Sequence, residues 1–289
     1  MRPTEAPLDW TRVDVVVPRA PLRTPGAAMA GFRHGVSAPV DIAMVAHPAV
    51  TLLVDLSGEG ELVHRARDRH GRGSVVVGLL PGDFRAGGLV GECLQIRLEP
   101  VVAASVFGVS AGSDGSDGAV VSLADVWGCE AERFEEGLRA AGSWEERFAL
   151  AADVLGRRLG AGPRVDPEVA HAWRRTFGRR GRVRVDGLAD EVGWSRKRLS
   201  ARFRSQLGVT PKRAARLVRF DRAARLLAAG HAAADVAAGS GYADQSHLHR
   251  EVREFTGLTP SAVAVAPWLA IDDVAWPASS PARRPTGRA

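Results

Sequence analysis

The sequence predicts an α+β chain in two parts: a β-rich barrel or sandwich followed by helices, and an all-α domain with two helix-turn-helix units joined by a linker helix. Two observations predict this fold class. The first hundred residues carry short, Val-rich runs separated by turn residues, a pattern typical of strands. The last third carries a helical frame that occurs twice. At 289 residues the chain is long enough for two domains with separate cores.

The strands of the first part are expected where apolar runs are short and bounded by turn formers. The segment VTLLVDLSGEGELVHR, residues 50–65, is interpreted as a hairpin with its turn at 57–60. Several such strands with Gly-rich connections favour a small barrel or sandwich. The expected strands are 13–17, 40–46, 50–56, 74–80 and 93–98.

Helices are expected after the strands. Pro100 suits a first helical position, and the spacing of apolar residues predicts further helices near 130–141 and 144–159. The sequence GAGP at 160–163 is typical of a linker. The tail from residue 267 has too little apolar surface to offset the entropy of ordering, so it is expected to be disordered.

The repeated frame is GWSRKRLSARFRSQLGVTP at 193–211 and GYADQSHLHREVREFTGLTP at 241–260. Its matching residues are structural: two apolar residues on one helical face, a Gly that ends the helix, and a Thr-Pro pair that starts the next one. The matched pairs are Leu199 and Leu248, Phe203 and Val252, Gly208 and Gly257, Thr210 and Thr259, and Pro211 and Pro260.

A short apolar helix precedes each copy, at 187–192 and at 234–240, and leads into a Gly-aromatic pair. A short helix, a turn with Gly and a second amphipathic helix make a helix-turn-helix. The segment 212–228 between the copies predicts a helical rod of about 25 Å. Such a spacer could place the two second helices in successive major grooves, which repeat at about 34 Å, if the DNA bends or the helices tilt.

The charge distribution indicates a nucleic-acid binder. Residues 164–261 hold 20 Lys+Arg against 10 Asp+Glu, a net charge of +10, whereas the whole chain has +6. The two cysteines are not clustered, which argues against a disulfide framework or a structural zinc site. The N-terminus lacks a signal-peptide pattern and no apolar run is long enough to cross a bilayer, so a cytoplasmic protein without a membrane partner is expected.

On these residues, the span 165–262 resembles the DNA-binding domain of AraC/XylS-type transcription regulators, whose second unit ends in a Gly-x-Thr-Pro signature like that at 257–260. The N-terminal part is similar to their sensor halves, with a cupin-like barrel, and VVSLADVWG at 120–128 resembles a segment found there. The resemblance implies a sequence-specific transcription regulator that reads the major groove with two recognition helices. It leaves open modulation by a ligand or by dimerisation.

With this resemblance the expected domains are a sensor or oligomerisation domain at 1–128, a helical extension and linker at 129–163, the tandem helix-turn-helix domain at 164–266 and the tail at 267–289. The expected partners are double-stranded DNA, a small-molecule effector and a second copy of the chain. Neither the effector nor the target sequence can be identified, and activation and repression are equally open.

The resemblance also assigns candidate DNA contacts. Among them, Gln245 suits adenine and Arg250 suits guanine, because each can form two hydrogen bonds to the edge of that base. Ala201 can touch a thymine methyl group but cannot donate a hydrogen bond. The base-facing candidates are Lys197, Ser200, Ala201, Gln245, Ser246, His247 and Arg250, and the phosphate candidates are Arg196, Arg202, Arg204 and Arg253.

No catalytic motif supports an enzyme. The sequence has no GxSxG, HExxH, Walker A loop or GxGxxG after a strand, and the histidines of the N-terminal half are scattered. No catalytic residue, cofactor or metal site is therefore expected. The alternative hypothesis is an enzyme-type barrel fused to a DNA-targeting module.

Overall fold

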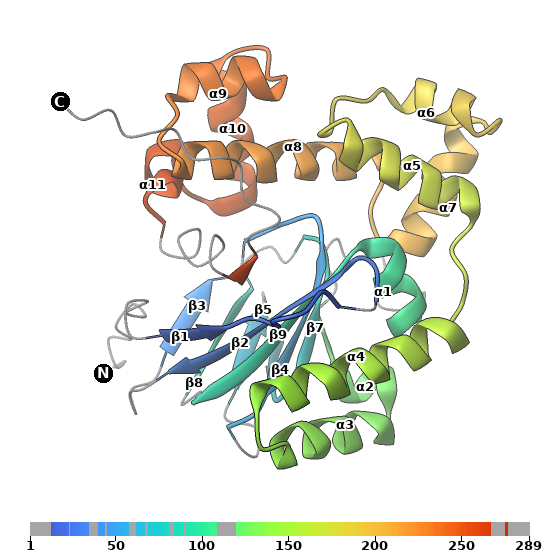
Figure 1. Cartoon of the computed structure of the whole chain (residues 1–289). Helices are drawn as coiled ribbons and strands as arrows, with labels where there is room; N and C mark the ends of the chain where they lie inside the picture. Colours follow the sequence, from blue (N-terminus) through green and yellow to red (C-terminus); the bar gives the residue numbers. More distant parts are fainter. Residues whose placement is uncertain are drawn as a thin grey trace.

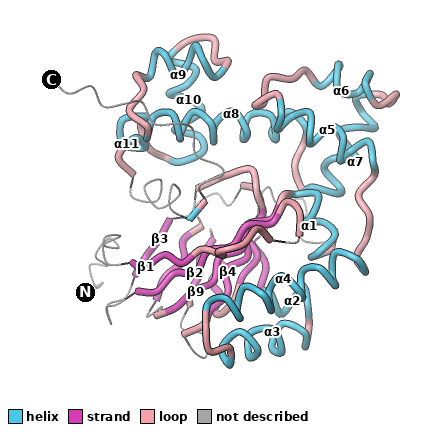
Figure 2. Tube along the Cα trace, in the orientation of Figure 1, coloured by secondary structure: helices cyan, strands magenta, loops and turns pink. Residues whose placement is uncertain are grey.

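The computed structural model describes residues 13–22, 24–34, 40–43, 45–57, 62–66, 69–80, 84–88, 91–108, 120–266 and 275–276. Two β-sheets form the lower half of the molecule in Figure 1, helices cover one sheet face, and a helical domain lies above them. The tube in Figure 2 shows the same division between strands and helices. This is the fold class that the sequence predicts.

The strands form two antiparallel sheets. The six-stranded sheet has the order β1 (Val13–Val16), β2 (Ala27–His34), β9 (Glu92–Leu98), β4 (Val50–Asp55), β7 (Val75–Val77) and β10 (Val120–Ser122). The four-stranded sheet has the order β3 (Val40–Ala43), β8 (Arg85–Gly88), β5 (Val63–Ala66) and β6 (Arg69–Arg72). Each of the five expected strands is present.

The centre of the six-stranded sheet, at β4 and β7, is buried on both faces. Successive side chains of a strand point to opposite sides, so each of these strands contributes to two cores. On β4, Leu52 and Val54 pack in the core beneath the helices, whereas Leu53 packs with Phe84 and Ala86 in the core that contains residues of the second sheet. The helices of this part are α1 (Pro100–Phe107), α2 (Leu123–Trp127), α3 (Cys129–Ala140) and α4 (Trp144–Ala161). They match the helices expected from Pro100, from 130–141 and from 144–159.

The predicted hairpin at 50–65 is wrong. β4 pairs with β7 and β9, whereas β5 pairs with β6 and β8 in the other sheet. The carboxylate of the buried Asp55 gives a physical reason: it accepts hydrogen bonds from the backbone N–H of Ser57 (3.0 Å) and of Leu62 (2.9 Å). These bonds fix the end of β4 beside Leu62, the residue before β5.

Strand β2, AAMAGFRH, is not predicted by the sequence pattern because its centre is rich in Ala and Gly. The close approach of a helix explains why residue 31 is a glycine. A Cβ atom on Gly31 would lie 2.3 Å from the ring of Trp144, the first residue of α4. A small residue is therefore required here for α4 to pack on the sheet.

The C-terminal domain consists of seven helices in the described part of the chain: α5 (Pro167–Gly178), α6 (Val185–Glu191), α7 (Arg196–Leu207), α8 (Pro211–Ala228), α9 (Ala233–Ser240), α10 (Gln245–Thr256) and α11 (Pro260–Ala264). Helix α8 is the predicted linker helix. Its 18 residues make a rod of about 27 Å. It runs along the domain between α5 and the group α9, α10 and α11 (Figure 1).

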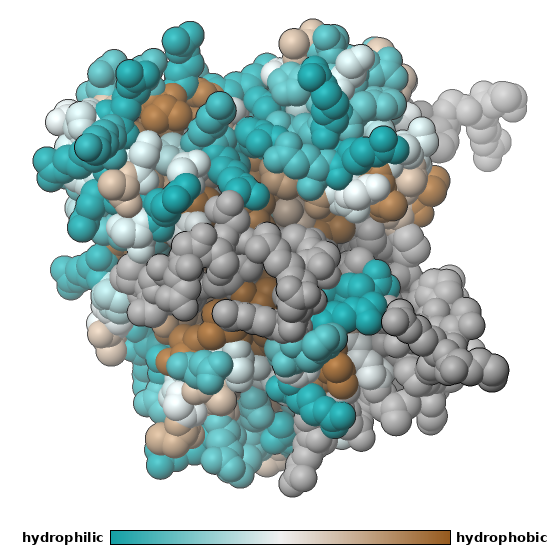
Figure 3. All heavy atoms as spheres, turned by 180° about the vertical axis from the view of Figure 1, so that it is seen from behind, coloured by the Kyte–Doolittle hydropathy of each residue, from teal (hydrophilic) through white to brown (hydrophobic). Residues whose placement is uncertain are grey.

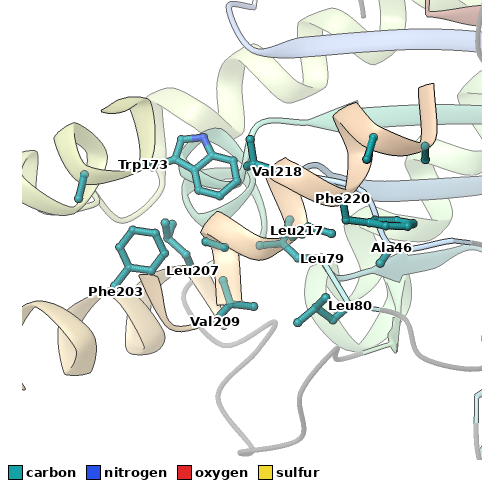
Figure 4. Close-up of a cluster of buried hydrophobic side chains, with 14 of the residues drawn as sticks. Ala46, Leu79, Leu80, Trp173, Phe203, Leu207, Val209, Leu217, Val218 and Phe220 are labelled. Carbon is teal, nitrogen blue, oxygen red and sulfur yellow. The ribbon is translucent and has the colours of Figure 1, made fainter. Parts of the chain in front are cut away.

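The two parts of the molecule share one hydrophobic core. Ala46, Leu79 and Leu80 of the N-terminal part are buried in the same cluster as Leu217 and Phe220 of α8. Figure 4 shows these side chains gathered beside α8. Helix α1 also contacts α7. The helix that joins the two helix-turn-helix units therefore packs directly on the β-rich domain.

Two residues of the tail are described, and both are buried. Ala275 and Trp276 pack against Ala30 of β2, and the guanidinium of Arg97 lies 4.2 Å from the centre of the Trp276 ring. These two residues do not behave as part of a disordered tail. The other residues of 267–289 lie outside the described part of the chain, so the expectation of disorder is not tested there.

His47 lies near the boundary between the two parts. Its Nε2 is 3.0 Å from Thr51 Oγ1, and its Nδ1 accepts a hydrogen bond from the backbone N–H of Ala49. Burial lowers the pKa of His47 well below its usual range, and the positive charges of Arg97 and Arg225 lower it further. The folded protein therefore holds this ring neutral.

Stability should fall on mild acidification because of His47. In the unfolded chain His47 is protonated near pH 6.5, whereas in the folded chain its pKa lies well below that value. The contribution of the neutral ring to the free energy of unfolding is therefore complete above about pH 6.5 and is lost as the pH falls below it. Urea unfolding at about pH 7.5 and 5.5 measures the loss. His47→Gln should reduce it, whereas replacing the exposed His70 with Gln should not. An unchanged pH dependence in His47→Gln would contradict this account.

Candidate nucleic-acid interface

The two copies of the repeated frame are built alike at their start. Ser195 caps α7 by accepting a hydrogen bond from the backbone N–H of Arg198, and Asp244 caps α10 by accepting one from that of His247. Asp and Ser are among the most effective residues at this position. The two helices therefore begin at equivalent residues, Arg196 and Gln245, which are 49 residues apart.

The copies also end alike. Gly208 (φ 77°) and Gly257 (φ 71°) adopt the left-handed conformation that ends a helix and that glycine tolerates best. Thr210 and Thr259 then cap α8 and α11, each of which begins with proline. The frame predicted from the sequence is thus confirmed residue by residue.

One face of each second helix is completely buried. Leu199 and Phe203 on α7 and Leu248 and Val252 on α10 are 0% exposed. They pack in the core cluster that also contains α5 and α8. This apolar face fixes the rotation of both helices, so the opposite face of each points to solvent.

An ion pair anchors α7 to α5. Arg202 makes two hydrogen bonds to Asp166, the residue before α5, at 2.7 and 2.9 Å. The hydrogen bond from Arg202 holds the pKa of the Asp166 carboxyl below its usual range. Gln206 strengthens the same contact by accepting a hydrogen bond from the backbone N–H of Asp166 at 3.0 Å.

The equivalent position on α10 has the opposite charge. Glu251 is 1% exposed and accepts hydrogen bonds from Arg216 (2.8 Å) and Arg219 (2.9 Å) of α8. Glu254 also pairs with Arg216. Despite its burial, the pKa of Glu251 is lowered, because these arginines stabilise its charged form. The same position thus anchors α7 to the start of α5 and α10 to α8, with the charges exchanged.

The third residue of each second helix packs on the aromatic residue of the turn. Arg198 lies 4.4 Å from the centre of the Trp194 ring, and His247 packs edge-on against Tyr242 with ring centres 5.2 Å apart. His247 also accepts a hydrogen bond from the backbone N–H of Ala243. His247 is therefore turned toward its own turn rather than outward.

The face opposite the core carries an outward stripe on each second helix, at the spacing i, i+3, i+4 and i+7 that aligns residues along a helix. All of its members are exposed except Ser200, which is half-buried. The stripe comprises Lys197, Ser200, Ala201 and Arg204 on α7, and Ser246, His249, Arg250 and Arg253 on α10.

The cations of the two outward stripes differ from Arg196 and Arg202 because they form no ion pair with a carboxylate among the described residues. Lys197, Arg204, Arg250 and Arg253 have no carboxylate partner in the described part of the chain. By contrast, Arg196 pairs with Asp186 at 3.1 Å and Arg202 with Asp166. The four cations of the stripes are therefore available to an external anion.

Most of the candidates named from the sequence are brought together on these stripes. Arg196, Arg202 and His247 make contacts within the protein instead, and Gln245 is exposed at the first position of α10 with its amide nitrogen 3.4 Å from His249 Nε2. His249 was missed. The 49-residue spacing of the repeat could have found it, because that spacing pairs Ser200 with His249.

Three further arginines gather between the two units. Arg180 and Arg182, in the turn after α5, lie close enough to Arg222 of α8 to affect its ionisation; burial lowers the pKa of Arg222 and their charges add to the effect. The side chain of Arg182 also reaches Gly241, in the turn of the second unit. From behind, the upper part of the molecule is largely hydrophilic (Figure 3).

Features of other functional classes are scarce in the described residues. No group of three or more His, Cys, Asp or Glu side chains could hold a metal ion there. No helix in the described ranges is long and apolar enough to cross a membrane. Burial raises the pKa of the Cys93 thiol to about 12, so this cysteine is not an activated nucleophile.

Comparison with known proteins identifies the segment that carries this interface. Residues 188–264 match the family described as "Helix-turn-helix domain". The segment is an AraC-type helix-turn-helix domain. The match includes α7 and α10, the linker helix between them and both buried faces. No relative was found among curated proteins.

Several solved structures are similar to this chain. The crystal structure of ToxT from Vibrio cholerae O395 is 12% identical, covering 84% of this chain and 100% of that one (TM-score 0.45). The C-terminal domain of AraT, a response regulator from Geobacillus stearothermophilus, is 20% identical over 35% of this chain and 87% of that one (TM-score 0.34). A xylose-binding transcription activator, XylR, is 19% identical, covering 42% of this chain and 39% of that one (TM-score 0.31). At these identities and scores, none of the similarities bears on what this chain binds.

The buried ion pair of the AraC-type domain predicts a large stability effect. Glu251→Ala leaves Arg216 and Arg219 without their shared carboxylate, and should lower the free energy of unfolding by about 3 kcal/mol. Glu254→Ala removes an exposed partner of Arg216 and should cost less than about 1 kcal/mol. Chemical denaturation measures both, and equal losses would contradict the anchoring role of Glu251.

Proposed function

We propose that this protein is a transcription regulator that binds double-stranded DNA with the outward stripes of α7 and α10. The observation that carries the proposal is that two equivalent, solvent-facing stripes bear cations with no carboxylate partner in the described residues. DNA carries one phosphate charge per about 1.7 Å of its axis, so such stripes would gain strongly from its field.

The two stripes differ in what they can read. On α10, Arg250 suits guanine, and Ser246 and His249 add hydrogen-bonding groups beside it. Gln245 at the start of the same helix suits adenine. On α7, Ala201 offers only a methyl contact between Lys197 and Arg204. We therefore assign most of the base discrimination to α10 and mainly backbone affinity to α7.

The phosphate candidates can be ranked by their partners within the protein. Arg204 and Arg253 lie on the stripes and are available to DNA, whereas Arg196 and Arg202 would first have to leave Asp186 and Asp166. An ion pair already made in the free protein offsets part of the gain from a new one with phosphate, by about 0–1 kcal/mol for exposed pairs such as these. Arg180, Arg182 and Arg222 lie between the units and could meet the backbone that passes there.

Modulation through the N-terminal domain belongs to the same proposal. Helix α8 spaces the two reading helices, and its Leu217 and Phe220 pack on Leu79 and Leu80 of the β-rich part. A ligand or a second copy of the chain that shifts this contact would change the relative placement of the two stripes. Two copies on adjacent sites would also raise each other's effective concentration.

Arg250→Ala tests the proposal. It should lower the preference for the specific over a scrambled site by about 1–3 kcal/mol, because a bidentate contact to one base is lost. The full chain and its variants are titrated with both duplexes at fixed salt, the specific site being taken from genome-wide mapping of bound DNA. Arg202→Ala, whose arginine pairs with Asp166, is the matched control and should leave the preference unchanged. An unchanged preference in Arg250→Ala would contradict the reading role of α10.

A further inference from the structure

A turn rich in arginine joins α5 to α6, the first helix of the first helix-turn-helix unit. This arginine turn spans residues 179–184, and its exposed residues are Arg179, Arg180, Arg182 and Arg184. The turn is docked on α8 (Figure 1), because a Cβ atom on its buried Gly181 would lie 2.1 Å from the carbonyl oxygen of Ala215. It therefore has a fixed place in the domain.

The arginine turn lies between the N-terminal ends of α7 and α10, the ends at which such helices contact base edges. On one side, Asp186 at the start of α6 pairs with Arg196, the first residue of α7, at 3.1 Å. On the other side, a Cβ atom on Gly241 would lie 3.0 Å from Cδ of Arg182, and Gly241 belongs to the turn that leads into α10. The arginine turn thus connects the two reading ends.

The positive charge of the arginine turn is not neutralised at its centre. Arg184 lies 3.8 Å from Asp186, whereas Arg180 and Arg182 form no ion pair in the described part of the chain. Arg222 of α8 is close to both, and its Nε is buried without a hydrogen-bond partner. Burial lowers the pKa of Arg222, and the charges of Arg180 and Arg182 lower it further. An anion beside these three arginines would relieve their mutual repulsion.

The equivalent turn of the second unit has no arginine. It joins α8 to α9 with four residues, Ala-Gly-His-Ala at 229–232, where the arginine turn has six. Both turns contain a left-handed residue, with φ 84° at Gly230 and 55° at Arg180, and each donates its backbone N–H to the carbonyl three residues earlier. Among the described residues, Arg180 is the only one other than glycine with positive φ. An arginine held in this disfavoured conformation indicates a function for its side chain.

The geometry of the duplex places a minor groove opposite the arginine turn. Two helices in successive major grooves on one face of DNA have the minor groove between them on that face. A narrow minor groove, as in A·T tracts, attracts arginine through its enhanced negative potential. The groove floor of A·T pairs also offers the N3 and O2 acceptors, whereas a G·C pair adds an amino group.

We propose that Arg180 and Arg182 enter the minor groove between the two half-sites and give the protein a preference for A·T pairs there. Arg222 adds positive charge behind them. This contact rests on the DNA binding proposed above. It extends the recognised sequence to base pairs that neither α7 nor α10 reads, so the site is recognised at three places.

Titrations of the full chain with three duplexes test the contact. The duplexes share both half-sites, taken from genome-wide mapping of bound DNA, and carry A·T, G·C or inosine·cytosine pairs midway between them. We expect the A·T spacer to bind more tightly than the G·C spacer by about fivefold or more. The inosine·cytosine spacer should bind like the A·T spacer, because inosine lacks the amino group that guanine presents in the minor groove. Equal binding of all three duplexes, or inosine·cytosine binding like G·C, would overturn the proposal.

The double variant Arg180→Gln, Arg182→Gln should lose the spacer preference. Both side chains are exposed, so the fold should persist. The matched control is Arg164→Gln, Arg174→Gln, which removes the same charge from exposed positions of the same domain and should keep the preference. A preference that persists in the first variant, or that the control also loses, would overturn the assignment. Equal weakening of the first variant on all three spacers would show contact with phosphates alone, and would overturn it as well.

The preference for the specific half-sites separates this proposal from the function proposed above. Arg180→Gln, Arg182→Gln should leave that preference unchanged, whereas Arg250→Ala should lower it. A chain that bound no duplex specifically would overturn both proposals. Specific binding that depends on Arg250 but not on the spacer would overturn the minor-groove contact alone.

Discussion

The packing of α8 is the constraint on which both parts of the molecule depend. This helix packs against both helix-turn-helix units and against the β-rich domain, so much of its surface is buried. The residues at most 3% exposed are Ala214, Leu217, Phe220, Ala223 and Ala224. Small residues allow close approach. A turn at Gly181, with φ 72°, fits against α8 so closely that a Cβ atom would lie 2.1 Å from the carbonyl of Ala215.

The same position of each second helix carries an anchoring charge. Arg202 of α7 pairs with Asp166 at the start of α5, and Glu251 of α10 pairs with Arg216 and Arg219 of α8. With the apolar face and this anchor fixed, each second helix has one face left for solvent. The cations on that face have no carboxylate partner in the described residues, so their field is available to an external polyanion.

Much of the C-terminal domain could be predicted from the sequence because its signals are local. Caps, left-handed glycines and apolar pairs four residues apart each act within one or two turns of helix, and the repeat doubles them. The partners of Arg196 and Arg202 could not be predicted in this way. Asp186 and Asp166 are brought to them by tertiary packing, and the same holds for the turn of His247 toward Tyr242.

In the β-rich domain the local signals were sufficient for five of the strands, but not for β2 and not for the pairing of the strands. The end of β4 is fixed beside Leu62 by two backbone amides that donate to Asp55. The packing of α4 on β2 depends on the close approach of Trp144 to Gly31. The shared core also depends on tertiary packing. Nothing in the local sequence of Ala46, Leu79 and Leu80 indicates that they lie in one buried cluster with α8. Coupling between the domains is therefore a property of the fold that no single segment discloses.

The central claim is that α8 holds α7 and α10 on one face of the duplex, and hydroxyl-radical footprinting of the full chain on its specific site tests it most directly. Two protected stretches on the same face, centred about one helical turn (about 10 base pairs) apart, are expected. A single protected stretch, or two stretches on opposite faces of the duplex, would contradict the claim.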